Sequence, residues 1–233
     1  MRRSSNGRAE DSVGRRNYNE ASKPEAERAR TNDPQKTKAD ILRIAFEEFS
    51  SNGYAGARID KIAARTSTSK RMLYYYYESK DGLYRAVLNE YYRRLRTAER
   101  ALKLEGKPPL IALAELVSFT FDYHNNNPDG VRLILDENIH NGRTVSGLPD
   151  VEGLNVAIIR SVRDICDRGE RSGAIRPHLD PIDLYQTIAA LSFFNISNRY
   201  TFSKIFQRDM TSTEALAARR ALVVETVLRF VAA

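Results

Sequence analysis

The chain has 233 residues and a formal net charge of +7, from 37 Lys and Arg against 30 Asp and Glu. Its hydrophobic fraction of 42% suits a globular core, and no apolar run approaches the roughly 18 residues of a membrane span. A single cysteine, Cys166, excludes an internal disulfide, and no apolar stretch follows Arg2-Arg3 to make a signal peptide. We therefore expect a cytoplasmic protein that does not bind membranes.

Positive charge is concentrated at the N-terminal side. Residues 1–36 carry 9 basic and 6 acidic side chains (+3), residues 37–83 carry 8 and 6 (+2), and residues 84–107 carry 7 and 3 (+4). The remainder, 108–233, carries 13 and 15 (−2). This asymmetry indicates a polyanion-binding N-terminal part, although a basic, merely solubilising surface would give the same count.

Residues 1–36 hold almost no large apolar side chains, which predicts a disordered, basic tail. The pattern changes at Thr37, which can act as the N-cap of a first helix, and Gly53 is a natural stop for that helix. Apolar residues recur between them at helical spacing, at Ile41, Leu42, Ala45, Phe46 and Phe49.

Three more helices are predicted before the next break. A short second helix fits residues 59–65, and a third runs from a Ser69 cap to about Tyr77. Ser79 can cap a fourth helix that extends to about Leu104.

Gly106 and the Pro108-Pro109 pair end the fourth helix and mark a domain boundary. Strand patterns are absent from the rest of the sequence, so the fold class is all-α, and the last long apolar stretch should bend near residues 195–198. Five further helices are predicted, over residues 109–125, 129–140, 151–171, 181–206 and 212–232.

The second and third helices, joined by the turn Thr66-Ser67-Thr68, have the layout of a helix-turn-helix unit. Such a unit inserts the start of its second helix into the major groove of double-stranded DNA. Lys and Arg there can donate to guanine, while hydroxyl groups serve bases or phosphates. The candidate DNA-binding residues are Arg58, Thr68, Ser69, Lys70, Arg71, Tyr74, Tyr75 and Lys80.

These motifs resemble the TetR family of bacterial transcriptional regulators over about residues 37–95. The resemblance rests on Ser69-Lys70, Leu73-Tyr74-Tyr75 and Ser79-Lys80 at the family's spacing, with Ala45-Phe46, Phe49, Gly53-Tyr54 and Ile62-Ala63 at its core positions. Ser67 departs from the usual Gly of the turn, Arg71-Met72 from small residues, and Tyr76-Tyr77 from a His-Phe pair.

The resemblance implies a homodimeric repressor that binds a pseudo-palindromic operator and leaves it when a small-molecule effector binds. It divides the chain into the tail (1–36), a helix-turn-helix domain (37–83), a connecting helix (84–107) and an effector-binding and dimerisation domain (108–233). The family forms its dimer through the last two helices, which here carry more apolar residues than one helix face needs. A DNA-binding protein without an effector, constitutive or architectural, is the alternative.

The C-terminal part also offers a mixture of apolar and polar side chains suited to a ligand pocket. The guanidinium of Arg163 suits a carboxylate, which favours an organic acid as the effector. The candidate effector-binding residues are Phe119, Tyr123, His124, Leu135, Asn138, His140, Ile159, Arg163, Phe193 and Asn198.

Signatures of other functions are weak. His124, His140 and His178 are scattered and lack cysteine partners, so no metal site is predicted. The sequence also lacks a nucleophile elbow and a glycine-rich phosphate loop. We expect no cofactor and no enzymatic activity.

Overall fold

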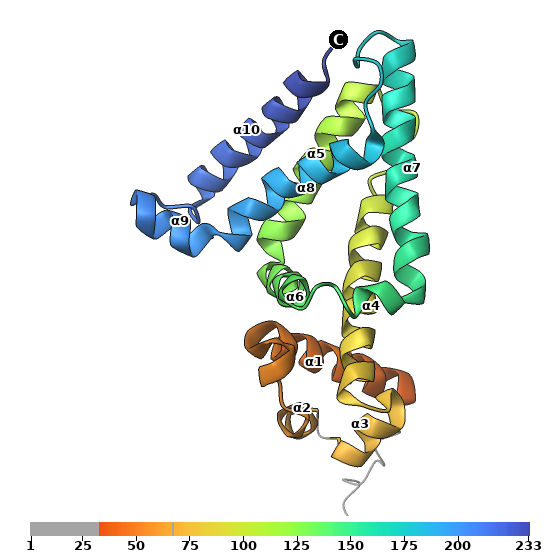
Figure 1. The fold of residues 1–233 in the computed structure, drawn as a ribbon, viewed down its shortest axis with the longest axis vertical. Helices are drawn as coiled ribbons and strands as arrows, with labels where there is room; N and C mark the ends of the chain where they lie inside the picture. The colour runs from red at the N-terminus through yellow and green to blue at the C-terminus, as the bar shows by residue number, and fades with distance from the viewer. Residues whose placement is uncertain (1–32, 67) are drawn as a thin grey trace, which may run out of the picture. The chain divides into compact units, whose positions relative to one another are not determined.

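The computed structural model describes residues 33–66 and 68–233, and residues 34–233 form one compact unit of helices (Figure 1). The described part contains no β-strand, only an isolated bridge between Ile175 and Ala232. The all-α prediction is confirmed. Most of the predicted tail and the Ser67 turn position lie outside the described residues.

The first helix, α1 (Pro34–Gly56), begins earlier than predicted. Proline is favoured in the first turn of a helix, so Pro34 moves the start upstream and places Thr37 inside the helix. The predicted stop at Gly53 is a kink with φ 66° and ψ 173°, beyond which one more turn forms.

The next helices follow the predicted boundaries closely. α2 spans Ile59–Arg65 and α3 spans Lys70–Tyr77. The Ser69 hydroxyl accepts from the Met72 amide at 3.2 Å, and the Ser79 hydroxyl accepts from the Gly82 amide at 3.0 Å, so both predicted N-caps are confirmed.

The fourth helix, α4 (Lys80–Arg100), is shorter than the predicted helix to Leu104. The chain turns before that point, and Lys103 has a positive φ of 49°. Burial of Leu104, which is 4% exposed, holds this turn against the C-terminal core. The predicted connecting helix therefore ends inside the 84–107 segment.

The C-terminal helices lie within one to two residues of most predicted bounds. The stretch 181–206 forms two helices instead of one, and the bend predicted near residues 195–198 is a break at Asn198 (φ −111°, ψ 3°). The elements are α5 (Pro109–Asn126), α6 (Pro128–Ile139), η1 (Val145–Gly147), α7 (Pro149–Arg171), α8 (Pro181–Ser197), α9 (Arg199–Phe206) and α10 (Thr213–Val231).

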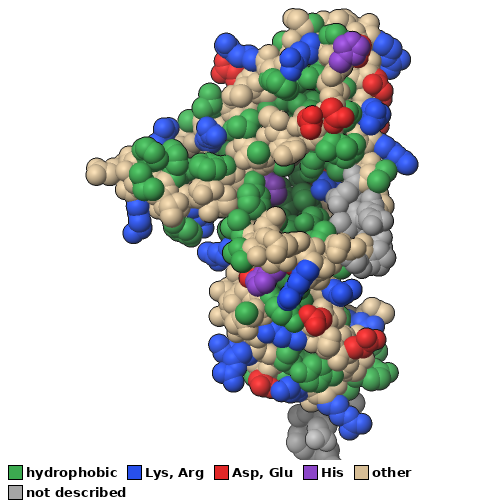
Figure 2. Space-filling model, in the orientation of Figure 1, with side chains coloured by type: hydrophobic (Ala, Val, Ile, Leu, Met, Phe, Trp, Pro, Cys, Tyr) green, Lys and Arg blue, Asp and Glu red, His purple; other side chains and the backbone are tan. Residues whose placement is uncertain are grey.

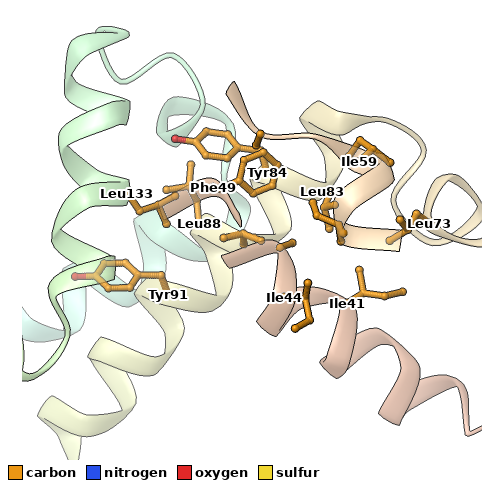
Figure 3. Close-up of a cluster of buried hydrophobic side chains, with 14 of the residues drawn as sticks. Ile41, Ile44, Phe49, Ile59, Leu73, Leu83, Tyr84, Leu88, Tyr91 and Leu133 are labelled. Atoms are coloured by element: carbon orange, nitrogen blue, oxygen red, sulfur yellow. The ribbon is translucent and has the colours of Figure 1, made fainter. Parts of the chain in front are cut away.

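Two hydrophobic clusters hold these helices together. The first joins α1 to α4 with Leu133 of α6, so a C-terminal helix contributes to the core of the helix-turn-helix part (Figure 3). The second joins α5, α7, α8 and α10 around side chains such as Leu116, Val162 and Ile188. None of the helices in the described part is long and apolar enough to cross a membrane.

Candidate functional site

The turn between α2 and α3 is held by its own threonines. The Thr66 hydroxyl donates to the Ile62 carbonyl at 3.0 Å, and the Thr68 hydroxyl donates to the Thr66 carbonyl at 3.2 Å. Burial of Ile62 and Leu73 fixes the inner faces of the two helices, which leaves the start of α3 on the surface. The geometry is that of a helix-turn-helix unit.

The predicted DNA-binding residues lie around that surface. Tyr74 and Tyr75 are 40% and 76% exposed, whereas Tyr77 is half-buried and its hydroxyl donates to the Lys38 carbonyl at 3.2 Å. Burial raises the pKa of Tyr77 to about 12, so its phenol stays neutral. Four more of the predicted residues are exposed, namely Arg58, Ser69, Lys70 and Arg71. Thr68 and Lys80 are partly exposed.

Lys70 has a partner that sequence reasoning missed. Its Nζ lies 2.9 Å from Asp60 Oδ1 of α2, and both side chains are exposed. The hydrogen bond to Asp60 raises the pKa of Lys70. Helical spacing could not have predicted this ion pair, because the two residues are ten apart in sequence and lie on different helices. Asp60 will repel phosphate wherever Lys70 attracts it.

Lys80 is positioned by an aromatic ring that was not among the predicted site residues. Its Nζ lies 4.9 Å from the centroid of Tyr54, and the Arg143 guanidinium lies 5.0 Å from the same ring. The Tyr54 hydroxyl donates to Asp81 at 2.5 Å. These contacts bring cations from α4 and from the loop after α6 to one aromatic ring.

A carboxylate of α6 binds the kinked end of α1. Asp136 Oδ2 accepts from the Tyr54 amide at 2.8 Å, and a Cβ added to Gly53 would lie 2.7 Å from Asp136 Oδ1. The Tyr84 hydroxyl also lies 3.5 Å from Asp136 Oδ2. Burial, with nearby Glu137 and Asp136, raises the pKa of Tyr84. We call the Asp136–Tyr54 hydrogen bond the α6–α1 latch.

A cavity of about 350 Å³ lies among α4, α5, α6 and α8, and we call it the aromatic cavity. Figure 2 shows a hollow on this face, with mostly hydrophobic side chains and a histidine beside it. The lining residues are Tyr91, Tyr92, Leu95, Arg96, His124, Ile134, Asn138, Tyr185, Gln186, Ala189, Ala190 and Phe193.

The charged group of this cavity is paired. The Arg96 guanidinium donates to Glu99 and, at 2.7 Å, to the Tyr185 hydroxyl, which itself donates to Glu99 at 2.9 Å. Arg96 and Glu99 are 7% and 4% exposed. Burial raises the pKa of Glu99, but the adjacent guanidinium and hydroxyl stabilise the carboxylate, so we treat the pair as ionised at neutral pH.

His124 is the other polar group of note. It is 8% exposed, its ring lies 5.5 Å from that of Phe193 between centroids, and its Nδ1 has no hydrogen-bond partner among the described residues. Burial, reinforced by the Arg96 charge, lowers the pKa of His124 to about 4. The imidazole is therefore neutral at pH 7.

Three of the ten predicted effector-binding residues, His124, Asn138 and Phe193, line the aromatic cavity. Phe119 and Tyr123 pack together on α5 beside it, and Leu135 is half-buried one position from the lining Ile134. Since neighbouring helical residues point about 100° apart, a position next to a lining residue faces elsewhere.

The remaining four predicted residues are not in the lining of the aromatic cavity. Arg163 is exposed on α7, and Ile159 packs against the second hydrophobic cluster. The His140 ring lies 2.7 Å from the Asp136 carbonyl, and Asn198 donates to Ser197 at the α8–α9 break. Arg163, expected to bind a carboxylate, does not line the aromatic cavity. The group of Arg96, Glu99 and Tyr185 was missed because Tyr185 of α8 meets a pair on α4 from 86 to 89 residues away.

The fold and this surface define a helix-turn-helix DNA-binding protein with an α-helical C-terminal part. Residues 41–87 match the family model "Bacterial regulatory proteins, tetR family", and residues 109–227 match "Tetracyclin repressor-like, C-terminal domain". The chain belongs to the TetR family of transcriptional regulators.

Similar proteins agree with this assignment. The chain is 32% identical over 200 residues to the HTH-type transcriptional repressor NicS of Pseudomonas putida, covering 86% of this chain and 94% of NicS. It is 31% identical to the repressor SCO4008 of Streptomyces coelicolor, over 69% of this chain and 78% of that protein. The structure of SCO4942 from Streptomyces coelicolor superposes with a TM-score of 0.63 at 28% identity, covering 84% and 98% of the two chains.

Proposed function

We propose that this protein is a homodimeric repressor that binds a pseudo-palindromic operator and is released by a small molecule in the aromatic cavity. NicS and SCO4008 are both named transcriptional repressors, which supports repression over activation. In this proposal residues 37–83 bind DNA, and residues 108–233 bind the effector and form the dimer. Residues 84–107 connect these two parts.

The observation that carries the proposal is the placement of α6. Ile134 and Asn138, one helical turn apart, line the aromatic cavity. Asp136 lies between them in sequence, so it points away from that face and reaches α1 through the α6–α1 latch. One helix thus contacts both the ligand space and the DNA-binding part, with α4 as a second connection.

Release then follows from a shift in α6 and α4. A ligand changes operator affinity only if it binds the DNA-bound and released shapes differently. A ligand that displaces Ile134 or Asn138 would move Asp136 relative to Tyr54, and so alter the position of α3. We expect a coupling of about 1–3 kcal/mol, or roughly 5- to 150-fold in operator affinity.

A dimer surface is supported by exposed apolar residues on the last helices. Phe194 of α8 is 44% exposed, and Leu222 and Phe230 of α10 are 51% and 46% exposed. Tyr200 and Phe206 of α9 are also exposed, at 58% and 61%. Clustered exposed apolar residues of this kind mark protein interfaces.

The test begins with DNA selected from a random pool by the full-length protein, followed by operator binding in metabolite fractions. Asp136→Ala should leave ligand binding intact but reduce the ligand-induced change in operator affinity. Asp129→Ala is the matched control, because Asp129 lies on the same helix in an exposed ion pair with Arg132. A ligand that fills the cavity without changing operator affinity would overturn the release mechanism.

A further inference from the structure

The charge balance of the aromatic cavity argues against an ionised ligand. The Arg96 guanidinium already binds the Glu99 carboxylate and the Tyr185 hydroxyl inside the protein. A ligand carboxylate would add a second negative charge beside a guanidinium that Glu99 already neutralises, and it would lose part of its hydration.

The lining residue His124 carries a buried atom that a ligand could pair with. His124 Nδ1 is buried without a hydrogen-bond partner among the described residues, although buried polar atoms are nearly always paired in native proteins. A hydroxyl group can either donate or accept, so it would satisfy this atom in either tautomer of the neutral ring.

The remaining walls suit flat, apolar molecules. Rings of Tyr91, Tyr92, Tyr185 and Phe193 face the cavity from α4 and α8. The small side chains of Ala189 and Ala190 leave room between them. Aromatic rings stack on or meet edge-on with other rings, and each such pair adds to simple area burial.

We propose that the aromatic cavity binds uncharged, planar aromatic molecules bearing a hydroxyl group, and discriminates against aromatic carboxylates. The proposal rests on the proposed function in naming the class of its effector. The hydroxyl binds His124, and the Arg96–Glu99 pair sets the preference for an uncharged molecule.

Three probes of nearly equal shape test this on the full-length protein by calorimetric titration at pH 7. 2-Naphthol is neutral with a hydroxyl, 2-methoxynaphthalene lacks the donor, and 2-naphthoate is an anion. We expect 2-naphthol to bind about tenfold or more tighter than 2-naphthoate, and about fivefold tighter than 2-methoxynaphthalene. In His124→Phe the advantage of 2-naphthol over 2-methoxynaphthalene should disappear.

Charge substitution provides the sharper test. Glu99→Gln removes the carboxylate and leaves the Arg96 charge uncompensated, so the preference should reverse towards 2-naphthoate. Tyr185→Phe is the control, because it retains both charges and should still prefer 2-naphthol. Ala189→Phe should fill the cavity and abolish binding of all three probes, whereas Ala64→Phe, on the exposed side of α2, should not.

Several results would overturn the proposal: tighter binding of 2-naphthoate by the unaltered protein, no binding of any probe, or binding unaffected by Ala189→Phe. The unaltered protein alone decides the first two, so a variant that does not fold cannot obscure them. Operator affinity measured in the same samples reports on the proposed function separately. Binding of 2-naphthol without operator release would contradict the release mechanism and leave the ligand class standing.

Discussion

At the scale of single residues, His124 links cavity chemistry to stability. Its pKa is lowered from 6.5 to about 4 by burial and by the Arg96 charge. Between these values the unfolded chain binds a proton that the folded chain does not, so this residue lowers the free energy of unfolding as the pH falls. Above about pH 6.5 the imidazole is neutral in both states, and this loss of stability disappears.

We expect this residue to cost about 2 kcal/mol of stability on going from about pH 7.5 to pH 5. The measurement is urea unfolding at both pH values for the unaltered protein and for His124→Phe. Carboxylates that titrate in the same range affect both proteins, so their effect cancels in the difference. Parallel pH dependence in the two proteins would show that His124 is not held neutral.

We expect the candidate DNA-binding cations to act in two ways. Lys80, seated on the Tyr54 ring, should bind phosphate, so Lys80→Ala should weaken binding about equally on all sequences and lower the salt slope by about one unit. Lys70→Ala or Arg71→Ala should change which bases are preferred. Arg163→Ala, at an exposed position of α7, serves as the control. A uniform loss in all three DNA-face variants would contradict the division.

At the scale of elements, the kink in α1 is matched to α6. Gly53→Ala would strain a backbone with φ 66° and place its methyl 2.7 Å from Asp136. We expect a loss of roughly 1–2 kcal/mol, together with weaker operator binding through a displaced α6–α1 latch. Thermal and urea unfolding with an operator titration measure both effects.

Gly56→Ala is the control for that change. Gly56 lies in the same helix end without a positive φ, and its added Cβ would make an ordinary 3.4 Å contact with Asn52. It should be neutral or stabilising. Equal losses in the two variants would mean that flexibility of the helix end, rather than the latch, determines the effect.

Local patterns in the sequence were enough to predict most helices and the exposed start of α3. Ser69, Ser79 and the apolar spacing of α1 act within one or two turns, so they can be read without the fold. Tyr54, Asp60 and Arg96 could not be placed in this way, because each has a partner on another helix, 10 to 89 residues away. The position of Arg163 outside the aromatic cavity was not foreseen, because helical spacing does not say which helix face meets a cavity.

At the scale of the whole molecule, assembly should decide operator affinity. The unaltered protein should scatter light with a mass near twice 26.5 kDa. Leu222→Glu would put a charge on the exposed apolar side of α10 and should give monomers that bind the operator weakly. Ile139→Glu is the control, since Ile139 is 76% exposed on α6, apart from the proposed interface. A monomeric unaltered protein would overturn the dimer.

The aromatic cavity also gives the molecule an optical signal of its own. The chain has no tryptophan, and three of its 12 tyrosines, Tyr91, Tyr92 and Tyr185, stand in the cavity wall. The intrinsic fluorescence therefore comes from tyrosine, and an aromatic molecule bound among these rings would quench it. Phe193→Trp would add a single indole at the same wall, with emission well separated from that of the tyrosines. Occupancy could then be followed in real time while the protein sits on unlabelled operator DNA.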